Sequence, residues 1–550
     1  MNKRHYFILL LLAIGVCAIA MRLVDLHIFN HEFLSAQGDL RTVRTVNLPA
    51  HRGMILDRNG EPLAISTPVD SIWVNPKQYF QNPEDITPLA EVLDLDVRDL
   101  AARLHKNRDR EFLYLKRQIS PELAQNTLDL EIKGVYTERE YRRFYPLGEA
   151  SAHLVGVTNI DGEGQEGIEL ALNTLLTGQA GKKRVLKDRL GQVIEDLELI
   201  TPNQDGRDIY LSIDRRIQYL AYRELKAAVL RHQAQAGSII VLDVDTGEVL
   251  ALVNQPSFNP NNRSDRAQEA MRNRAVTDLF EPGSTMKPLA MAAILETGQV
   301  DFATEVDTSP GYMTVHGKVV RDFRNYGRLS LPMVLRHSSN VGMTKLLLPL
   351  PVEDILDTWQ RLGLAQTTYS GLPGEQSGRM VISPTIDPFS YATLAFGYGL
   401  SVTALQLAQA YATVAHHGIN NPISVLRLEG APAAREALSS KVADAVRNML
   451  ILQENDAGTG QDARIPGYFV AGKTGTTRKL GESGYVDDRH LALFAGFAPA
   501  TNPRIVVVVL IDEPTQGAYY GGEVAAPIFA DVMGGVLRLL NIAPDNLPKS

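Results

Sequence analysis

An uncharged run near the N-terminus, Tyr6–Met21, limits what this chain can fold into more than any other feature. As a helix it covers about 24 Å, and a few apolar residues beyond it extend it toward the ~30 Å of a bilayer core. Lys3 and Arg4 precede the run and no cluster of cations follows it. The positive-inside rule then predicts a cytoplasmic stub of residues 1–5, a transmembrane anchor over 6–26, and the bulk of the chain outside the cytoplasm.

Two other interpretations of this segment remain open. Ala18-Ile19-Ala20 resembles a signal-peptidase site, which would give a cleaved and secreted protein. Cys17 could suggest a lipoprotein, but Val16 stands where a small residue is expected. Because Cys17 is the only cysteine, intramolecular disulfides and cysteine-based zinc sites are excluded, and a single thiol suits an oxidising compartment.

Length and charge narrow the class of protein. A chain of 550 residues exceeds one compact domain. The 55 basic and 63 acidic residues give a net charge of −8, which argues against nucleic-acid binding because such proteins need a basic face. With 45% hydrophobic and 21% charged residues, the composition is that of a globular protein.

The chain divides at a turn-rich cluster, 201–206. Before it, short strands and turns predominate, with a hairpin turn at 57–60, amphipathic stretches within 85–130 and a helix over 167–176. We therefore expect a β-rich, non-catalytic pedestal domain over 27–208.

Residues 209–550 have a different pattern, with strands at both ends and helices between them. This order predicts one mixed antiparallel sheet covered by helices, an α+β domain. The expected strands are 209–213, 238–243, 249–254, 491–498 and 504–511, and the expected helices are 215–234, capped by Asp214, and 524–540.

The first candidate motif is Glu281-Pro-Gly-Ser284-Thr-Met-Lys287, which leads into an apolar helix. Proline and glycine mark a helix start, so Ser284 and Lys287, three residues apart, share one face. Serine needs a base to become a nucleophile. Lysine can serve only if burial and a second cation lower its pKa by about three units. A helix start with a solvated lysine explains a single such motif equally well.

A second motif, Ser338-Ser339-Asn340, places a hydroxyl and an amide two residues apart, where they can hydrogen-bond a lysine and relay a proton. Alone it is weak, because Ser257-Phe258-Asn259 has the same pattern.

A third motif is Lys473-Thr474-Gly475-Thr476, in a segment that reads as a strand. Gly475 would let a ligand approach the backbone. Alternation puts Thr474 and Thr476 on one side, suited to holding a carboxylate, and Lys473 on the other, from where it must lean across the strand edge. An exposed edge strand with a protective lysine is the alternative.

In this order the three motifs resemble the active-site set of penicillin-binding proteins and serine β-lactamases. Segments upstream look like the non-catalytic domain of the class B enzymes, and Phe396-Gly-Tyr-Gly399 and Tyr519-Tyr-Gly-Gly522 are similar to the branch of that class that builds the division septum. The upstream segments are Arg52-Gly-Met-Ile-Leu-Asp57-Arg58-Asn-Gly60, Arg143-Phe-Tyr-Pro146-Leu-Gly148 with His153 and Gly156, Gly167-Ile-Glu169, and Lys187-Asp188-Arg189-Leu-Gly191.

The resemblance implies a penicillin-binding transpeptidase fold and a two-step acyl transfer without a cofactor. Ser284 would attack the D-Ala-D-Ala bond of a stem peptide while Lys287 takes its proton, and the backbone N–H groups of Ser284 and Thr476 would form the oxyanion hole. The other implied roles are proton handling by Lys473, Ser338 and Asn340, and carboxylate binding by Thr474 and Thr476 beside Gly475.

The same resemblance implies partners and a location. Stem peptides supply the donor and the amine acceptor, β-lactams acylate the serine, and an FtsW-like membrane glycosyltransferase and other division proteins associate with the chain. The location would be the bacterial inner membrane, single-pass, with the bulk periplasmic. Alternative functions are an elongation-specific transpeptidase, a D,D-carboxypeptidase, a β-lactamase, and a division scaffold whose chemistry is dispensable.

Several further residues have competing interpretations. Tyr398, Tyr519 and Tyr520 could line the substrate cleft or simply pack. Arg52, Arg143 and Glu169 could form ion pairs that join the two domains, or a solvated surface. Gly162-Glu-Gly164-Gln-Glu-Gly167 matches a dinucleotide fingerprint, but its glutamates would repel a pyrophosphate. The twelve histidines show no metal-ligand spacing, and His416-His417 reads as a helix end.

Overall fold

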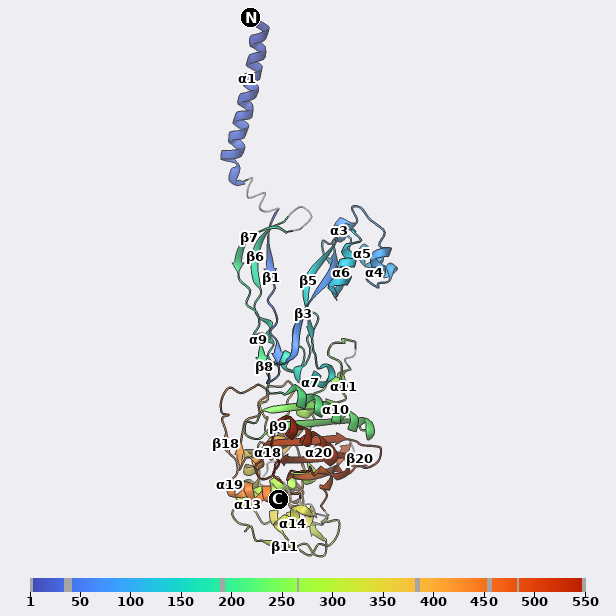
Figure 1. Cartoon of the computed structure of the whole chain (residues 1–550), viewed down its shortest axis with the longest axis vertical. Helices are drawn as coiled ribbons and strands as arrows, with labels where there is room; N and C mark the ends of the chain where they lie inside the picture. Colours follow the sequence, from blue (N-terminus) through green and yellow to red (C-terminus); the bar gives the residue numbers. More distant parts are fainter. Residues whose placement is uncertain are drawn as a thin grey trace. The chain divides into compact units, whose positions relative to one another are not determined.

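The computed structural model describes residues 3–33, 42–187, 193–264, 267–380, 386–452, 458–481 and 484–546 (Figure 1). The motif residues Asp188 to Gly191 lie outside these described residues. The chain forms two compact units, one of residues 1–53 with 177–207 and one of 54–176 with 208–550, and each is described by itself.

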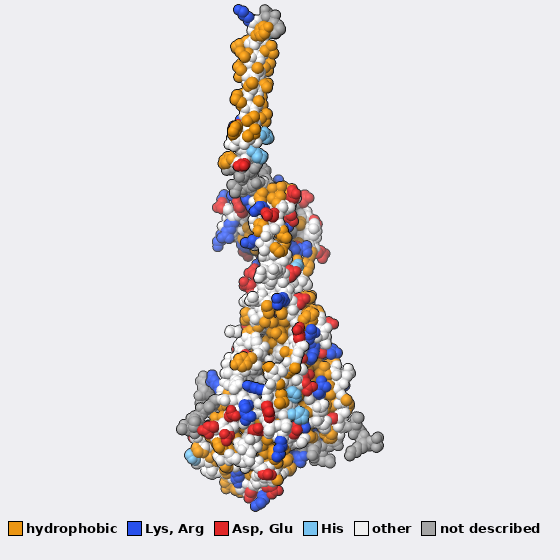
Figure 2. Space-filling model, turned by 90° about the vertical axis from the view of Figure 1, so that its left-hand side faces the viewer, with side chains coloured by type: hydrophobic (Ala, Val, Ile, Leu, Met, Phe, Trp, Pro, Cys, Tyr) orange, Lys and Arg blue, Asp and Glu red, His pale blue; other side chains and the backbone are white. Residues whose placement is uncertain are grey.

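The first unit contains the N-terminal helix α1 (Lys3–Val24), continued by a π-helical turn, Asp25–Phe29. It is the one helix among the described residues that is long and apolar enough to cross a membrane. None of its residues is buried, and hydrophobic side chains cover the face seen in Figure 2. The rest of the unit includes the antiparallel sheet β1 (Val43–Leu48), β6 (Gly181–Lys187) and β7 (Val193–Thr201).

The second unit begins with the predicted hairpin. β2 (Ile55–Leu56) and the long β3 (Pro62–Val74) are antiparallel and flank the turn at 57–60. β3 also pairs with β4 (Leu113–Ile119) and β5 (Val135–Phe144), and helices pack on these strands around a small core of their own. The helices are α3 (Pro76–Tyr79), α4 (Thr87–Val92), α5 (Val97–Lys106) and α6 (Pro121–Leu128).

Two predicted elements near 167–213 are shorter than expected. The helix predicted over 167–176 is broken at Leu172 into α8 (Gly167–Ala171) and α9 (Asn173–Thr177), and the Asn173 side chain accepts a hydrogen bond from the backbone N–H of Gly164. The strand predicted over 209–213 is only β8 (Ile209–Tyr210), which pairs in parallel with β2. A 3₁₀ turn, Gly148–Ala150, and α7 (Ala152–Val155) precede them.

The large sheet has five strands in the order β10-β9-β21-β20-β19. Every neighbouring pair is antiparallel, so the predicted "mixed" sheet is purely antiparallel. Among the described residues, β19 pairs with β20 on one side and, on the other, only through an isolated bridge between Ile451 and its first residue, Ala471. The strand of the third motif is therefore a sheet edge. The strands are β9 (Ala236–Asp243), β10 (Val249–Gln255), β19 (Ala471–Gly481), β20 (Gly484–Ala498) and β21 (Ile505–Asp512).

Helices cover both faces of this sheet (Figure 1). Ile239 and Val241 of β9 pack with α10 (Arg215–Arg231) and α20 (Gly521–Leu539), while their neighbours Ile240 and Leu242 pack on the other side. That side carries α13 (Lys287–Glu296) and α18 (Ala404–Ala415). Because successive side chains of a strand point to opposite faces of the sheet, a hydrophobic core forms on each face. Asp214 caps α10 as predicted, and His416 follows the end of α18.

Shorter elements surround α13. The helices are α11 (Gln268–Met271), α12 (Arg274–Thr277), α14 (Leu331–Arg336), α15 (Asn340–Leu347), α16 (Val352–Arg361), α17 (Pro388–Leu394) and α19 (Ser440–Met449), with 3₁₀ turns Gly283–Met286 and Gln461–Ala463. The paired strands are β11 (Glu305–Asp307) with β14 (Arg328–Ser330), β12 (Tyr312–Val315) with β13 (Lys318–Arg321), β15 (Arg379–Met380) with β16 (Leu400–Ser401), and β17 (Ile419–Asn420) with β18 (Arg435–Glu436).

Candidate active site

Ser284 lies on a tight 3₁₀ turn that runs directly into α13. Gly283, before it, has a φ of 54°, and a Cβ there would lie 2.3 Å from Cγ2 of Thr477 on β19. A side chain at 283 would push the turn off the strand. Lys287 is the first residue of α13 and Pro288 the second. A proline is tolerated there, because backbone N–H groups in the first turn of a helix have no acceptor within the helix. The glycine and the proline thus hold Ser284 against the edge strand.

Three side chains form a continuous hydrogen-bonded chain. Lys287 Nζ donates to Ser338 Oγ at 2.8 Å and also to the Ser338 carbonyl, and Ser338 Oγ donates to Ser284 Oγ at 3.1 Å. Ser338 adopts a left-handed backbone, with φ 54°, between α14 and α15. Two motifs that lie 54 residues apart in the chain therefore meet here. When both hydrogen bonds reverse, so that Ser284 donates to Ser338 and Ser338 donates to a neutral Lys287, a proton can pass from Ser284 to Lys287 along the same contacts.

Burial makes Lys287 an unusual lysine. Its residue is only 1% exposed, and desolvation, with a smaller contribution from the charge of Lys473, holds the pKa of Lys287 well below its usual value. The carboxylate of Asp322 acts in the opposite direction. A lysine whose pKa is lowered gives up its proton more readily than an exposed lysine and can act as a general base.

Lys473 lies on β19 and is also buried, with 5% exposure. Its Nζ donates to the carbonyl of Thr474 at 3.2 Å, and burial lowers the pKa of Lys473 to about 8. Next to it, a Cβ at Gly475 would lie 3.0 Å from Cγ2 of Thr285 and 3.1 Å from the carbonyl oxygen of Pro282. Glycine therefore lets the strand pack against the turn that carries Ser284.

The two threonines of the third motif face the beginning of α20. Thr476 Oγ1 accepts a hydrogen bond from the backbone N–H of Gly521 at 2.9 Å, and Thr474 Oγ1 lies 2.6 Å from Thr459 Oγ1. A Cβ at Gly522 would lie 3.7 Å from Cγ2 of Thr474. Two hydroxyls beside the positive end of a 19-residue helix favour a negatively charged ligand group.

Asn340 makes a different contact from the one its motif suggests. Its side-chain amide donates to the carbonyl of Arg321 at 3.1 Å, and its backbone N–H donates to Asp322. Asp322 also accepts from Ser339 Oγ and from the backbone N–H of Val341, so it caps α15. Sequence reasoning missed Asp322, because nothing in its local sequence marks it as a partner of residues 17 to 19 positions downstream.

The predicted tyrosines occupy two places. Tyr398 packs edge-on against Tyr485 with ring centroids 5.7 Å apart, and the Tyr485 hydroxyl donates to Glu281 at 2.9 Å. Glu281 also accepts from the backbone N–H of Gly399 at 2.8 Å. The roles of Glu281 and Tyr485 had no signal in the sequence, since the hydrogen bond spans 204 residues.

Tyr519 and Tyr520 lie just before α20 and are 38% and 51% exposed. Their hydroxyls are 3.0 Å apart, and the ring of Tyr519 stacks on His490. They flank the N-terminal end of the helix that contacts Thr476.

The three residues predicted to join domains are placed as follows. Arg143 Nε and Glu169 Oε1 form an ion pair at 2.7 Å, and both side chains are buried. This pair ties β5 to α8, both of which precede residue 208, and Arg143 also donates to Ser66 Oγ. Arg52 donates to Thr177 Oγ1 at 2.8 Å within the first unit.

Comparisons with known proteins agree with this geometry. A family model described as the penicillin-binding protein transpeptidase domain matches residues 237–534, and one described as the penicillin-binding protein dimerisation domain matches residues 47–211.

Named relatives match nearly the whole chain. A probable peptidoglycan D,D-transpeptidase PbpC of Pseudomonas aeruginosa is 42% identical over 549 residues, covering 100% of this chain and 97% of its own. The peptidoglycan D,D-transpeptidase FtsI of Escherichia coli K12 is 42% identical over 531 residues, covering 96% of this chain and 90% of its own.

A solved structure is similar over most of the chain. It is the penicillin-binding protein 3 of Mycobacterium tuberculosis in complex with aztreonam, with a TM-score of 0.71 and 27% identity over 91% of this chain and 98% of that one. The resemblance predicted from the motifs is confirmed, and the chain belongs to the penicillin-binding protein transpeptidases of class B.

Proposed function

We propose that the protein is a peptidoglycan D,D-transpeptidase that cross-links stem peptides at the division septum through an acyl-enzyme on Ser284. The observation that carries this proposal is the hydrogen-bonded chain from the buried Lys287 through Ser338 to Ser284. It supplies a nucleophile, a proton path and a base that is ready to accept a proton.

In the first step, Ser284 Oγ attacks the carbonyl carbon between the two terminal D-Ala residues. The hydroxyl proton passes through Ser338 to Lys287, and the backbone N–H groups of Ser284 and Thr476 stabilise the oxyanion. When the C–N bond breaks, the leaving D-Ala amine takes up a proton relayed by Ser338, with Lys473 and Asn340 in supporting roles. The product is an ester on Ser284 and free D-Ala.

The edge strand supplies the place for the substrate. Beyond the bridge at Ala471, no described strand pairs with the outer edge of β19, so an extended peptide can add to the sheet there as a further strand. Thr474 and Thr476, beside Gly475, hold the terminal carboxylate near the start of α20, and Tyr398, Tyr519 and Tyr520 border the bound peptide. The amine of a neighbouring stem then attacks the ester, and the new amide cross-links two strands. A β-lactam, which resembles D-Ala-D-Ala, acylates Ser284 in the same way.

The apolar helix α1 and the family support the proposed location and partners. The helix α1 would hold the protein in the inner membrane, with its N-terminus cytoplasmic and the bulk periplasmic. Residues 27–208 form the pedestal, in which Arg52, Arg143 and Glu169 hold the segments in place, and 209–550 form the catalytic domain. An FtsW-like membrane glycosyltransferase and other division proteins are the proposed partners.

The test of the chemistry is labelling of the full-length protein with a fluorescent penicillin, followed by mass spectrometry of the adduct. We expect one adduct, on Ser284, and none in Ser284→Ala. Labelling that persists in Ser284→Ala would refute the assignment of the nucleophile.

The septal role needs a cellular test. Depletion is expected to give filaments, whereas rounded cells would indicate an elongation enzyme. Ser284→Ala is expected to leave depleted cells filamentous, and a rescue of division by this variant would show that scaffolding is the main role.

A further inference from the structure

A cavity of about 720 Å³ lies beside the turn that carries Ser284, next to the far end of the edge strand. Its wall begins at Glu281, three residues before Ser284, and continues through β15, β16 and the end of β19. The residues used below are Arg272, Glu281, Arg379, Arg478 and Lys479.

The lining of this cavity is strongly cationic, although the whole chain carries a net charge of −8. Four of its side chains are basic and one, Glu281, is acidic. Glu281 is already bound to the Tyr485 hydroxyl and to the backbone N–H of Gly399. Its carboxylate is therefore committed to positioning Tyr485, and the cations of the wall have little compensation from within the cavity.

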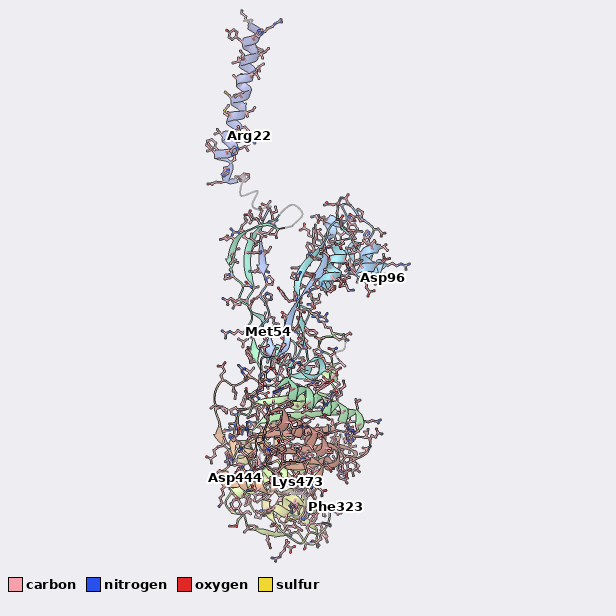
Figure 3. The ribbon with its side chains drawn as sticks, viewed as in Figure 1. Arg22, Met54, Asp96, Phe323, Asp444 and Lys473 are labelled. Atoms are coloured by element: carbon pink, nitrogen blue, oxygen red, sulfur yellow. The ribbon has the colours of Figure 1, made fainter. Side chains whose placement is uncertain are left out.

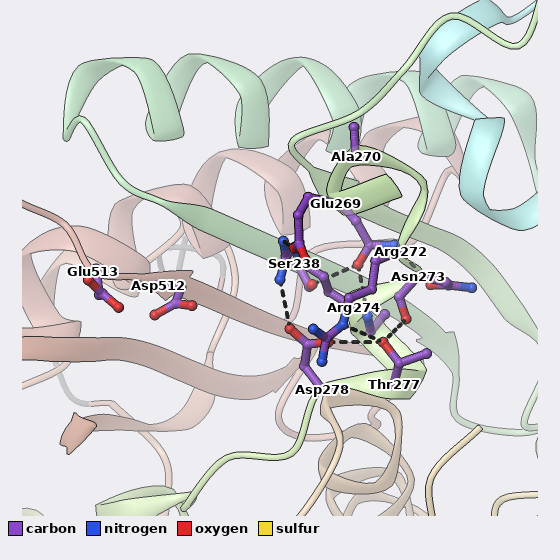
Figure 4. Close-up of polar contacts among 12 residues, drawn as sticks. Ser238, Glu269, Ala270, Arg272, Asn273, Arg274, Thr277, Asp278, Asp512 and Glu513 are labelled. Atoms are coloured by element: carbon purple, nitrogen blue, oxygen red, sulfur yellow. Dashed lines mark hydrogen bonds and ion pairs between the residues drawn. The ribbon is translucent and has the colours of Figure 1, made fainter. Parts of the chain in front are cut away.

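Two of the four cations are held in place by acids behind the wall. Lys479 lies 2.9 Å from Asp512 and 2.6 Å from Glu513. Arg272 Nε lies 2.6 Å from Asp278, which also accepts from Arg274 at 3.0 Å (Figure 4). Arg274 also pairs with Glu269 at 3.1 Å, so Asp278 and Glu269 together balance Arg272 and Arg274. Positive charge that a ligand can use must therefore come from the other two cations of the wall.

The other two cations are available to a ligand. Arg478 pairs with Asp487 at 2.7 Å, but that carboxylate is 86% exposed, and such surface pairs are weak and exchange easily. Arg379 is exposed on the two-residue strand β15, where its backbone pairs with Ser401, and its guanidinium makes no hydrogen bond or ion pair with the described residues.

The direction of the substrate along β19 leads into this cavity. The proposed carboxylate site is at Thr474 and Thr476, and the turn of Ser284 packs on the strand at 475–477. A peptide with its C-terminus at 474–476 must therefore run toward 478–481, antiparallel to β19. Strand alternation puts Arg478 on the same side as Thr474 and Thr476.

We propose that this cavity binds a carboxylate of the acyl-donor stem upstream of the scissile bond, through Arg379 and Arg478 with Arg272 in support. The proposal rests on the proposed transpeptidase function. The carboxylate can come from a γ-linked glutamate at the second stem residue or from a diaminopimelate at the third. A lysine at the third residue would instead bring an ammonium group toward four cations.

The experiment measures kcat/KM for D-Ala release by the detergent-solubilised full-length protein from four synthetic donor peptides, three pentapeptides and one tripeptide. One donor carries both carboxylates. In two others, either the γ-linked glutamate or the diaminopimelate is amidated, and a fourth, diacetyl-lysyl-D-Ala-D-Ala, carries neither. We expect the doubly acidic donor to exceed the neutral one about tenfold, in line with a hydrogen bond to a charged group. Loss of the preference on amidating one carboxylate identifies that carboxylate as the ligand.

Arg379→Ala should reduce that preference at least threefold, mainly through a higher KM for the acidic donor. Arg435→Ala is the matched control, because Arg435 is an exposed arginine on another two-residue strand, β18, of the same unit. Equal kcat/KM for all four donors, or an equal loss for all donors in Arg379→Ala, would overturn the proposal.

A second measurement, acylation by benzylpenicillin, distinguishes failure of the carboxylate site from failure of the proposed transpeptidase function. An enzyme that is acylated and releases D-Ala from the neutral donor, but shows no preference, contradicts only the carboxylate site. An enzyme that neither reacts with benzylpenicillin nor releases D-Ala from any donor contradicts the proposed function itself.

Discussion

Two buried charge sites of the second unit make an instructive comparison. In one, Lys287 and Lys473 are both buried, have the same sign, and have hydroxyls and carbonyls as their direct partners. In the other, Arg143 and Glu169 are buried with opposite signs, at 2.7 Å. Both sites remove charges from water, which is unfavourable in each case.

What differs is how the unfavourable energy of burial is relieved. At the lysines it is relieved by a lowered pKa, because losing a proton removes the charge. At the ion pair it is relieved by the opposite charge, which keeps both groups ionised and fixes β5 to α8. A buried charge without an opposite charge beside it therefore gives a lysine that loses its proton easily. A buried charge with an opposite charge beside it gives an ion pair that holds two elements together.

The largest effect should come from Lys287→Met. This change removes the proposed base, so we expect the rate of acylation by benzylpenicillin to fall by about 10³-fold, within the range for general bases. The folded protein should be at least as stable, because an apolar side chain replaces a buried polar amine whose desolvation is unfavourable. Stopped-flow acylation and thermal unfolding measure the two effects, and acylation within tenfold of wild type would show that Lys287 is not the base.

Breaking the Arg143–Glu169 ion pair should mainly reduce stability, whereas Lys287→Met should mainly reduce the acylation rate. Glu169→Ala removes the carboxylate that compensates the buried charge of Arg143, so we expect a loss of about 3–5 kcal/mol in the free energy of unfolding. Denaturant unfolding measures it, and Arg143→Met with Glu169→Leu together should recover most of the loss. The exposed pair Arg361–Asp357 is the control, for which Asp357→Ala should cost under about 1 kcal/mol. Equal losses at both pairs would contradict the comparison.

The pH dependence of acylation tests the coupling between the lysines. The rate should rise with pH as Lys287 loses its proton and bend near pH 8, where Lys473, with its pKa of about 8, becomes neutral. Lys473→Met removes a like charge, so the pKa of Lys287 should rise and the ascending limb should move up by about one pH unit. A limb that stays in place would show that the two ammonium groups do not interact.

The smallest effect should come from Asp322→Asn. Asp322 raises the pKa of Lys287, so its neutralisation should shift the ascending limb of the same profile down, by about half a pH unit. Asparagine keeps an oxygen that can accept the backbone N–H groups at the start of α15. A shift toward higher pH would contradict the direction of this interaction.

Much of the fold follows from local sequence patterns. Short apolar, β-branched runs placed β9, β10, β20 and β21, and Asp214 marked the start of α10, because these signals act over a few residues. The break between α8 and α9 was not predictable, since it accompanies a hydrogen bond between Asn173 and the distant backbone of Gly164.

For the site, the motifs identified the chemical groups but not all of their contacts. Ser284, Ser338 and Lys287 meet, as their combination predicted, yet nothing local showed that the route to the serine passes through Ser338. Asp322 and the Glu281–Tyr485 pair depend on contacts between remote segments, and such contacts leave no trace in a single sequence.

The outer edge of β19, which no described strand covers beyond Ala471, has one more consequence. A surface that accepts a peptide by main-chain hydrogen bonds cannot distinguish, through those bonds alone, a substrate from a strand of another protein molecule. The protein must therefore resist self-association while keeping this edge open. Arg478 and Lys479 lie at its far end, where like charges on two copies repel each other. Neutralising both cations should make concentrated protein more prone to aggregation. The solubility of the protein and the binding of its substrate would then depend on the same short part of β19.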